Sequence, residues 1–147
     1  MNLNFFILLF ITSNFVFGQE NQLYTKKEYV LLEYDLVEYF NNKAIKGNKI
    51  DFSYTYKKNN FAFSSKQNLE KFKANPEKYL PQYGGHCSYA MATLGKKVSP
   101  NPGVFEIRDG KLYFFHRQKG KENWQNGDTK ALKQQADSNW SKIILKN

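Results

Sequence analysis

The chain is short of cysteine and histidine, and this shortage excludes several kinds of site. Its 147 residues include one cysteine and two histidines, so an internal disulfide cannot form and neither a Cys-x-x-Cys nor a His-x-x-x-His pair is present. The motifs of common enzymes are also missing: there is no Gly-x-Ser-x-Gly elbow, P-loop, dinucleotide fingerprint or His-Glu-x-x-His motif. Hydrolase and nucleotide-binding functions of these types are therefore not predicted.

Arginine is also scarce, although the chain is strongly basic. The formal net charge is +9, and Arg108 and Arg117 are the only arginines. The lysines are scattered from Lys26 to Lys146, without the compact basic run that follows a phosphate backbone. We therefore expect a solvated lysine surface and no nucleic-acid partner.

The N-terminus has the pattern of a secretory signal peptide. Residues 1–18 carry no charged side chain, and their apolar run from Phe5 to Ile11 is too short to span a bilayer. We expect cleavage after Gly18 and export to the periplasm or the medium, with no membrane span in the mature chain. In such a compartment the single thiol either stays free or pairs with another molecule.

Two hairpins and several short helices are predicted after this segment. Alternating residues around a polar turn in 51–63, and the Asp109-Gly110 pair between two apolar runs, each predict an antiparallel β-hairpin. Capping residues and helical apolar spacing predict about four short helices. The predicted fold class is therefore α+β, a small single domain over 34–147 that follows a polar leader, 19–33. We expect this domain to be a monomer.

The only cysteine lies at the start of one predicted helix. After Gly84-Gly85, apolar residues recur at helical spacing up to a predicted C-cap at Gly95, namely Cys87, Ala90, Met91 and Leu94. In the first turn of a helix, the dipole and the free amides favour a reactive thiolate. The same apolar stripe also points Cys87 into the core, where a free cysteine is an inert apolar residue. Spacing alone leaves both roles open and favours the buried one.

Several stretches of the chain resemble the YHS domain family. They lie between Tyr34 and Trp140, and the most specific are Asn75-Pro76-Glu77-Lys78-Tyr79 and Tyr83-Gly84-Gly85-His86-Cys87. Residues 109–113 and 136–140 are similar to stretches of the stand-alone exported bacterial YHS proteins. The resemblance implies a YHS-like domain over 34–147.

The resemblance also implies where chemistry is found in this family. YHS domains accompany copper and other heavy-metal transporters, and bind metal through cysteines that follow the hairpin. Ser64 and Asn68 stand at those positions here, so this metal site does not transfer. The exported subgroup, which includes selenoproteins, keeps a thiol at the position of Cys87. The resemblance therefore favours a functional thiol, the reverse of what spacing alone favours.

Three functions are compatible with these residues. Cys87, His86 and His116 can hold a soft metal ion such as Cu(I) or Zn(II), which thiolate and imidazole ligands suit. Alternatively, Cys87 is a catalytic redox thiol that an external thiol partner resolves, because the chain has no second cysteine.

The third function is a non-catalytic interaction or ligand-binding module whose cysteine is structural. Aromatic residues of the hairpins and the C-terminal part either line a ligand cleft or form the core of such a module, the candidates being Tyr54, Phe61, Phe63 and Trp124.

Overall fold

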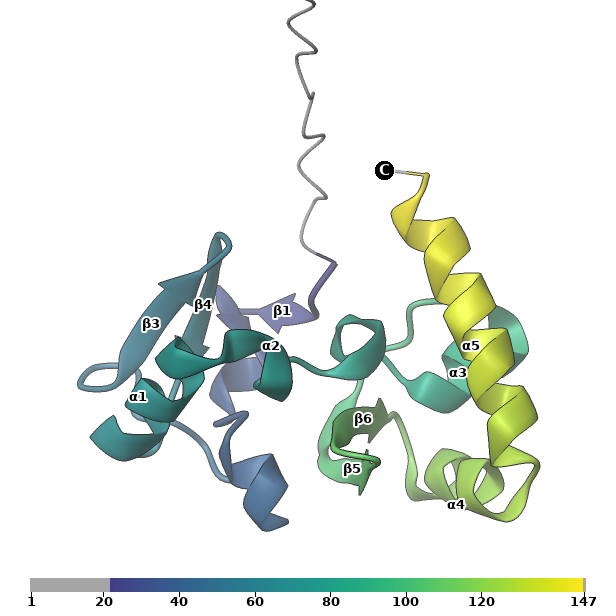
Figure 1. Ribbon diagram of the computed structural model, residues 1–147, viewed down its shortest axis with the longest axis horizontal. Helices are drawn as coiled ribbons and strands as arrows, with labels where there is room; N and C mark the ends of the chain where they lie inside the picture. Colours follow the sequence, from purple (N-terminus) through teal and green to yellow (C-terminus); the bar gives the residue numbers. More distant parts are fainter. Residues whose placement is uncertain (1–21, 147) are drawn as a thin grey trace, which may run out of the picture.

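A computed structural model describes residues 22–146 (Figure 1). In chain order the elements are β1 (Thr25–Lys26), β2 (Tyr29–Val30), η1 (Leu31–Glu33), η2 (Glu38–Asn41), β3 (Ser53–Tyr56), β4 (Asn59–Ala62), α1 (Lys66–Ala74), α2 (Pro76–Tyr79), η3 (Gln82–Gly85), α3 (Ser88–Leu94), β5 (Asn101–Arg108), β6 (Lys111–Phe115), α4 (Gln118–Asn126) and α5 (Thr129–Ile144). The predicted signal peptide, 1–18, lies outside the described residues. The predicted α+β class is confirmed.

Both predicted hairpins are present. Strands β3 and β4 pair in antiparallel register around Lys57 and Lys58, whose φ angles of 45° and 63° give the two-residue turn that matches strand twist. Strands β5 and β6 pair around Asp109 and Gly110, which also have positive φ angles, 51° and 71°. The first hairpin belongs to a larger sheet, with strand order β1-β2-β4-β3.

The segment 25–33 differs from the predicted polar leader. It forms β1, β2 and η1, and β2 lies parallel to β4 through the pair Tyr29 and Asn60. Val30 and Leu31 are 1% and 0% exposed. Strands of two residues are too short to show an alternating pattern, so the sequence did not reveal them.

Five α-helices occur among the described residues, where about four were predicted. The unpredicted helix is α4, whose only large apolar residue is Trp124, so no apolar residues recur along it at helical spacing. The sequence pattern Ser64-Ser65-Lys66-Gln67 predicts a capping box that starts at Ser64, but the N-cap is Ser65, one residue later, whose side chain accepts a hydrogen bond from the Asn68 amide. No helix in 22–146 combines the length and the apolarity needed to cross a membrane.

Strand β6 separates two hydrophobic cores. Leu112 and Phe114 pack in the first core with the N-terminal sheet and α1, whereas Tyr113 and Phe115 pack in the second with α3, α4 and α5. Figure 1 shows the β5–β6 hairpin between these two parts of the molecule. The alternation of a strand thus supplies one side chain pair to each core.

A glycine turn connects the N-terminal segment to the second core. Gly84 has a φ angle of 62°, and its carbonyl accepts a 2.7 Å hydrogen bond from the Tyr24 amide. A Cβ atom at Gly84 would lie 2.2 Å from the Gln22 carbonyl oxygen. The chain therefore needs glycine here both for the left-handed backbone and for the close approach of residue 22.

We predict that Gly84→Ala lowers the free energy of unfolding by more than about 3 kcal/mol, because left-handed strain and the clash with Gln22 add together. Gly110→Ala is the matched control: its φ angle is also positive, 71°, but nothing lies within 4 Å of a Cβ atom there. Only the backbone strain remains, about 1 kcal/mol. Chemical denaturation of both variants measures the difference, and equal losses would contradict the close approach.

Candidate functional site

Cys87 lies in the second core at the start of α3. It is the N-cap residue of this helix, one position before the helical turn in which the sequence analysis placed it. Its amide donates to the Val98 carbonyl at 2.9 Å, and its carbonyl accepts from the Met91 amide at 2.9 Å. The residue is 3% exposed, and its neighbours in the core include Tyr83 and Tyr113. The thiol is therefore enclosed by apolar and aromatic side chains.

His86 is also buried, at 8% exposure. Its Nδ1 lies 3.0 Å from the Tyr83 carbonyl oxygen, and its ring packs edge-on against Tyr24, with 5.7 Å between ring centroids. Trp140 covers the ring from α5, at 6.2 Å. Burial, together with the charge of Lys97, lowers the pKa of His86 against the opposing effect of the Tyr83 hydrogen bond. The imidazole beside Cys87 is thus neutral at pH 7 and offers no positive charge to a thiolate.

His116 lies on the surface, apart from the buried pair His86 and Cys87. It is exposed, and its Nδ1 is 2.8 Å from the Ser99 carbonyl oxygen. Across residues 22–146, no three side chains among the histidines, the cysteine and the carboxylates are grouped so that they could hold a metal ion. The three predicted metal ligands are accordingly not brought together as one set.

The two positions where the resemblance implies metal-binding cysteines form part of a buried hydrogen-bond network. Ser64 Oγ and Asn68 Nδ2 lie 3.3 Å apart, and both donate to Oδ2 of Asp35, at 2.7 and 2.8 Å. The Ser64 amide donates to the same oxygen, and the Val37 amide donates to Asp35 Oδ1. Asp35 is 0% exposed. The carboxyl group of Asp35 therefore organises these positions.

The aromatic candidates belong to the cores. Phe61, Phe63 and Trp124 are at most 2% exposed, and Tyr54 packs against the first core. Rings that fill a core cannot also line an open cleft. A ligand site must therefore be sought among surface residues.

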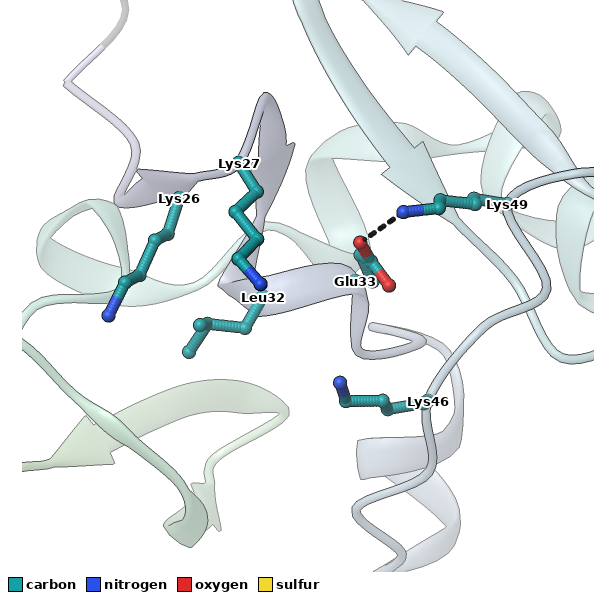
Figure 2. A pocket seen from close by; sticks show the side chains of 6 residues that line it. All are labelled: Lys26, Lys27, Leu32, Glu33, Lys46 and Lys49. Atoms are coloured by element: carbon teal, nitrogen blue, oxygen red, sulfur yellow. Dashed lines mark hydrogen bonds and ion pairs between the residues drawn. The ribbon is translucent and has the colours of Figure 1, made fainter.

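A surface cavity of about 250 Å³ lies between the β1–β2 region and the loop that precedes β3 (Figure 2). We name it the lysine pocket. Its lining residues are Lys26, Lys27, Leu32, Glu33, Lys46 and Lys49. Sequence reasoning missed this site because its lysines come from two segments about twenty residues apart, neither of which is unusually basic alone.

Hydrogen bonds between the two segments assemble the lysine pocket. The Asp35 amide donates to the Ile45 carbonyl at 2.8 Å, and the Gly47 amide donates to the Glu33 carbonyl at 2.7 Å. Lys49 Nζ lies 2.7 Å from Glu33 Oε1. This hydrogen bond is the main reason why the pKa of Glu33 is lowered, and the charges of Lys46 and Lys27 lower it further.

Comparisons of the chain with protein-family profiles, with curated proteins and with solved structures found no match. The geometry and chemistry of the described residues therefore carry the functional conclusions below.

We predict that Asp35→Ala lowers the free energy of unfolding by about 3 kcal/mol, because Ser64, Asn68 and the Val37 amide lose their acceptor in a buried site. The control is Asp51→Ala, which removes an exposed aspartate that accepts a 2.7 Å hydrogen bond from Asn48. We expect Asp51→Ala to lower the free energy of unfolding by less than about 1 kcal/mol. Urea denaturation checks both values, and a similarly small loss for Asp35→Ala would rule out the organising role of this carboxyl group.

The buried His86 predicts a loss of stability in mild acid. Because its pKa is lowered in the folded state, the unfolded chain binds this proton more tightly. The stabilisation that the neutral His86 contributes to the folded state is complete above the ordinary histidine pKa of about 6.5. It is lost as the pH falls from there toward the pKa of His86 in the folded state. The neutral variant His86→Gln should therefore lose less unfolding free energy than the wild type between about pH 7 and about pH 5.

Denaturation curves at several pH values measure this slope. His116→Gln is the matched control, since it makes the same replacement at the exposed histidine. A slope that His86→Gln leaves unchanged would be incompatible with a buried neutral imidazole.

Proposed function

We propose that this chain is an exported, YHS-like, non-catalytic ligand-binding module in which Cys87 is a structural residue. The observation that carries the proposal is the burial of Cys87, at 3% exposure, in the core around α3 and β6. Soft-metal binding and thiol redox chemistry both require that a partner reaches the sulfur. The enclosed position of Cys87 gives no such access.

The neighbours of Cys87 support the structural role. An activated thiolate depends on a nearby positive charge or on free amides. His86 is neutral at pH 7 because burial lowers its pKa, and the Cys87 side chain accepts no capping hydrogen bond from the amides of the first turn of α3. The residue therefore contributes packing at the junction of α3 with strand β6.

The network around Asp35 supports the YHS-like part of the proposal. The resemblance implies two ligand positions close in space, and Ser64 and Asn68 are 3.3 Å apart. Both side chains serve Asp35 and stabilise the junction of α1 with the segment around η2. In this chain Ser64 and Asn68, the positions of the family's metal-binding cysteines, thus have a structural function, and ligands bind at surface residues.

We predict that iodoacetamide leaves Cys87 of the folded protein unmodified over a time in which the denatured chain is fully labelled. Mass spectrometry of the intact protein gives both extents. Cys87→Ser should lower the free energy of unfolding by about 1 to 3 kcal/mol, because it places a hydroxyl group in an apolar site. Ready alkylation of the folded protein, with no loss of stability in Cys87→Ser, would favour the thiol redox function instead.

A further inference from the structure

We propose that the lysine pocket binds an oxyanion of the phosphate class, either free or as the phosphate group of a lipid. The inference rests on the proposed function, because it names the ligand class of the binding module. The charge of the pocket, the rigidity of its walls and its size support it.

The lysine pocket has an excess of positive charge. Four lysines and one glutamate line it, and the glutamate is paired with Lys49 at 2.7 Å. Within 22–146, Lys26, Lys27 and Lys46 have no carboxylate oxygen within 4.0 Å. Figure 2 shows the ammonium groups of Lys27 and Lys46 directed toward the space beside Leu32 and Glu33. A multivalent anion in this space would relieve the repulsion among these charges.

The walls of the pocket are held in place before any ligand arrives. The hydrogen bonds from Asp35 and Gly47 fix the loop that carries Lys46 against the segment that carries Glu33. A Cβ atom at Gly47 would lie 2.3 Å from the Ala62 carbonyl carbon, so this loop also packs closely on β4. Fixed walls reduce the ordering cost of binding.

The backbone of the other wall is strained. Half of the ten described non-glycine residues with positive φ angles lie in 27–33: Lys27, Glu28, Leu31, Leu32 and Glu33. Such conformations each cost on the order of 1 kcal/mol and concentrate at functional sites. Here the strained segment includes three of the six pocket residues, while the burial of Val30 and Leu31 anchors it.

The size and side chains of the pocket indicate the ligand class. A volume of about 250 Å³ corresponds to about eight water molecules, enough for one small anion with part of its hydration shell. The lining contains four lysines, and lysine ammonium groups bind phosphate as point charges. Leu32 is the only apolar lining residue, which argues against a large apolar ligand.

The test is a titration of the full mature protein with inorganic phosphate, followed by amide chemical shifts. Lys46→Gln should weaken the affinity about fivefold, because it removes a positive charge that no ion pair within the described residues holds. Glu33→Gln should strengthen it about fivefold, since it removes the opposing charge and releases Lys49. Lys142→Gln is the matched control: it makes the same charge change as Lys46→Gln at an exposed position of α5 and should leave the affinity unchanged.

Vesicles distinguish the two sources of the phosphate group. Sedimentation with vesicles of phosphatidylglycerol and phosphatidylcholine, reduced by Lys46→Gln, would identify a lipid phosphate. Phosphate binding without sedimentation would identify the free anion. The inference is overturned if phosphate does not saturate the shifts by about 50 mM, or if Lys142→Gln weakens binding as much as Lys46→Gln.

The two proposals can fail separately. An unreactive thiol in a protein that does not bind phosphate is a failure of this inference alone. A reactive Cys87 in a folded protein whose phosphate affinity responds to Lys46→Gln and Glu33→Gln is a failure of the structural role of the thiol alone.

Discussion

Strand β6 is buried on both faces, and each face completes a different core. Leu112 and Phe114 belong to the first core, and Tyr113 and Phe115 to the second. Because side chains alternate along a strand, a shift of register by one residue would exchange the two pairs and disrupt both cores at once. The turn at Asp109 and Gly110 fixes this register by pairing Arg108 with Lys111.

The position of the cysteine follows from this constraint. Cys87 forms an isolated parallel bridge with Phe114 and packs in the second core, so it lies where α3 meets the central strand. A residue at such a junction contributes to packing, and its replacement is felt by both elements. The burial of the thiol is thus a consequence of the way in which β6 organises the fold.

The buried carboxyl group of Asp35 and the strained backbone of 27–33 lie in different environments. Asp35 is enclosed and accepts hydrogen bonds from Val37, Ser64 and Asn68, so its burial stabilises the contact between η2 and α1. The strained segment 27–33 instead contributes Lys27, Leu32 and Glu33 to the lysine pocket, which four lysines and one glutamate line. Charge repulsion and strain at one surface location reduce stability unless a ligand compensates them, which distinguishes a binding surface from an ordinary solvated face.

Local patterns in the sequence were sufficient for much of the fold, because they act over a few residues. The cap at Gly95 and the Asp109-Gly110 turn, together with the α+β class, could be predicted in this way, and the start of α1 to within one residue. The two-residue strands and the polar helix α4 could not, since their stability comes from partners distant in the chain.

For the candidate sites, the sequence by itself determined which residues are able to bind a soft metal or to carry out thiol chemistry, namely one cysteine and two histidines. Only the tertiary structure decided that Cys87 and His86 are enclosed while His116 lies at the surface. It also brought Lys26 and Lys27 next to Lys46 and Lys49. The physical reason is that burial and charge density depend on which segments lie next to each other in space. Hydrogen bonds between segments distant in the chain help to fix that arrangement.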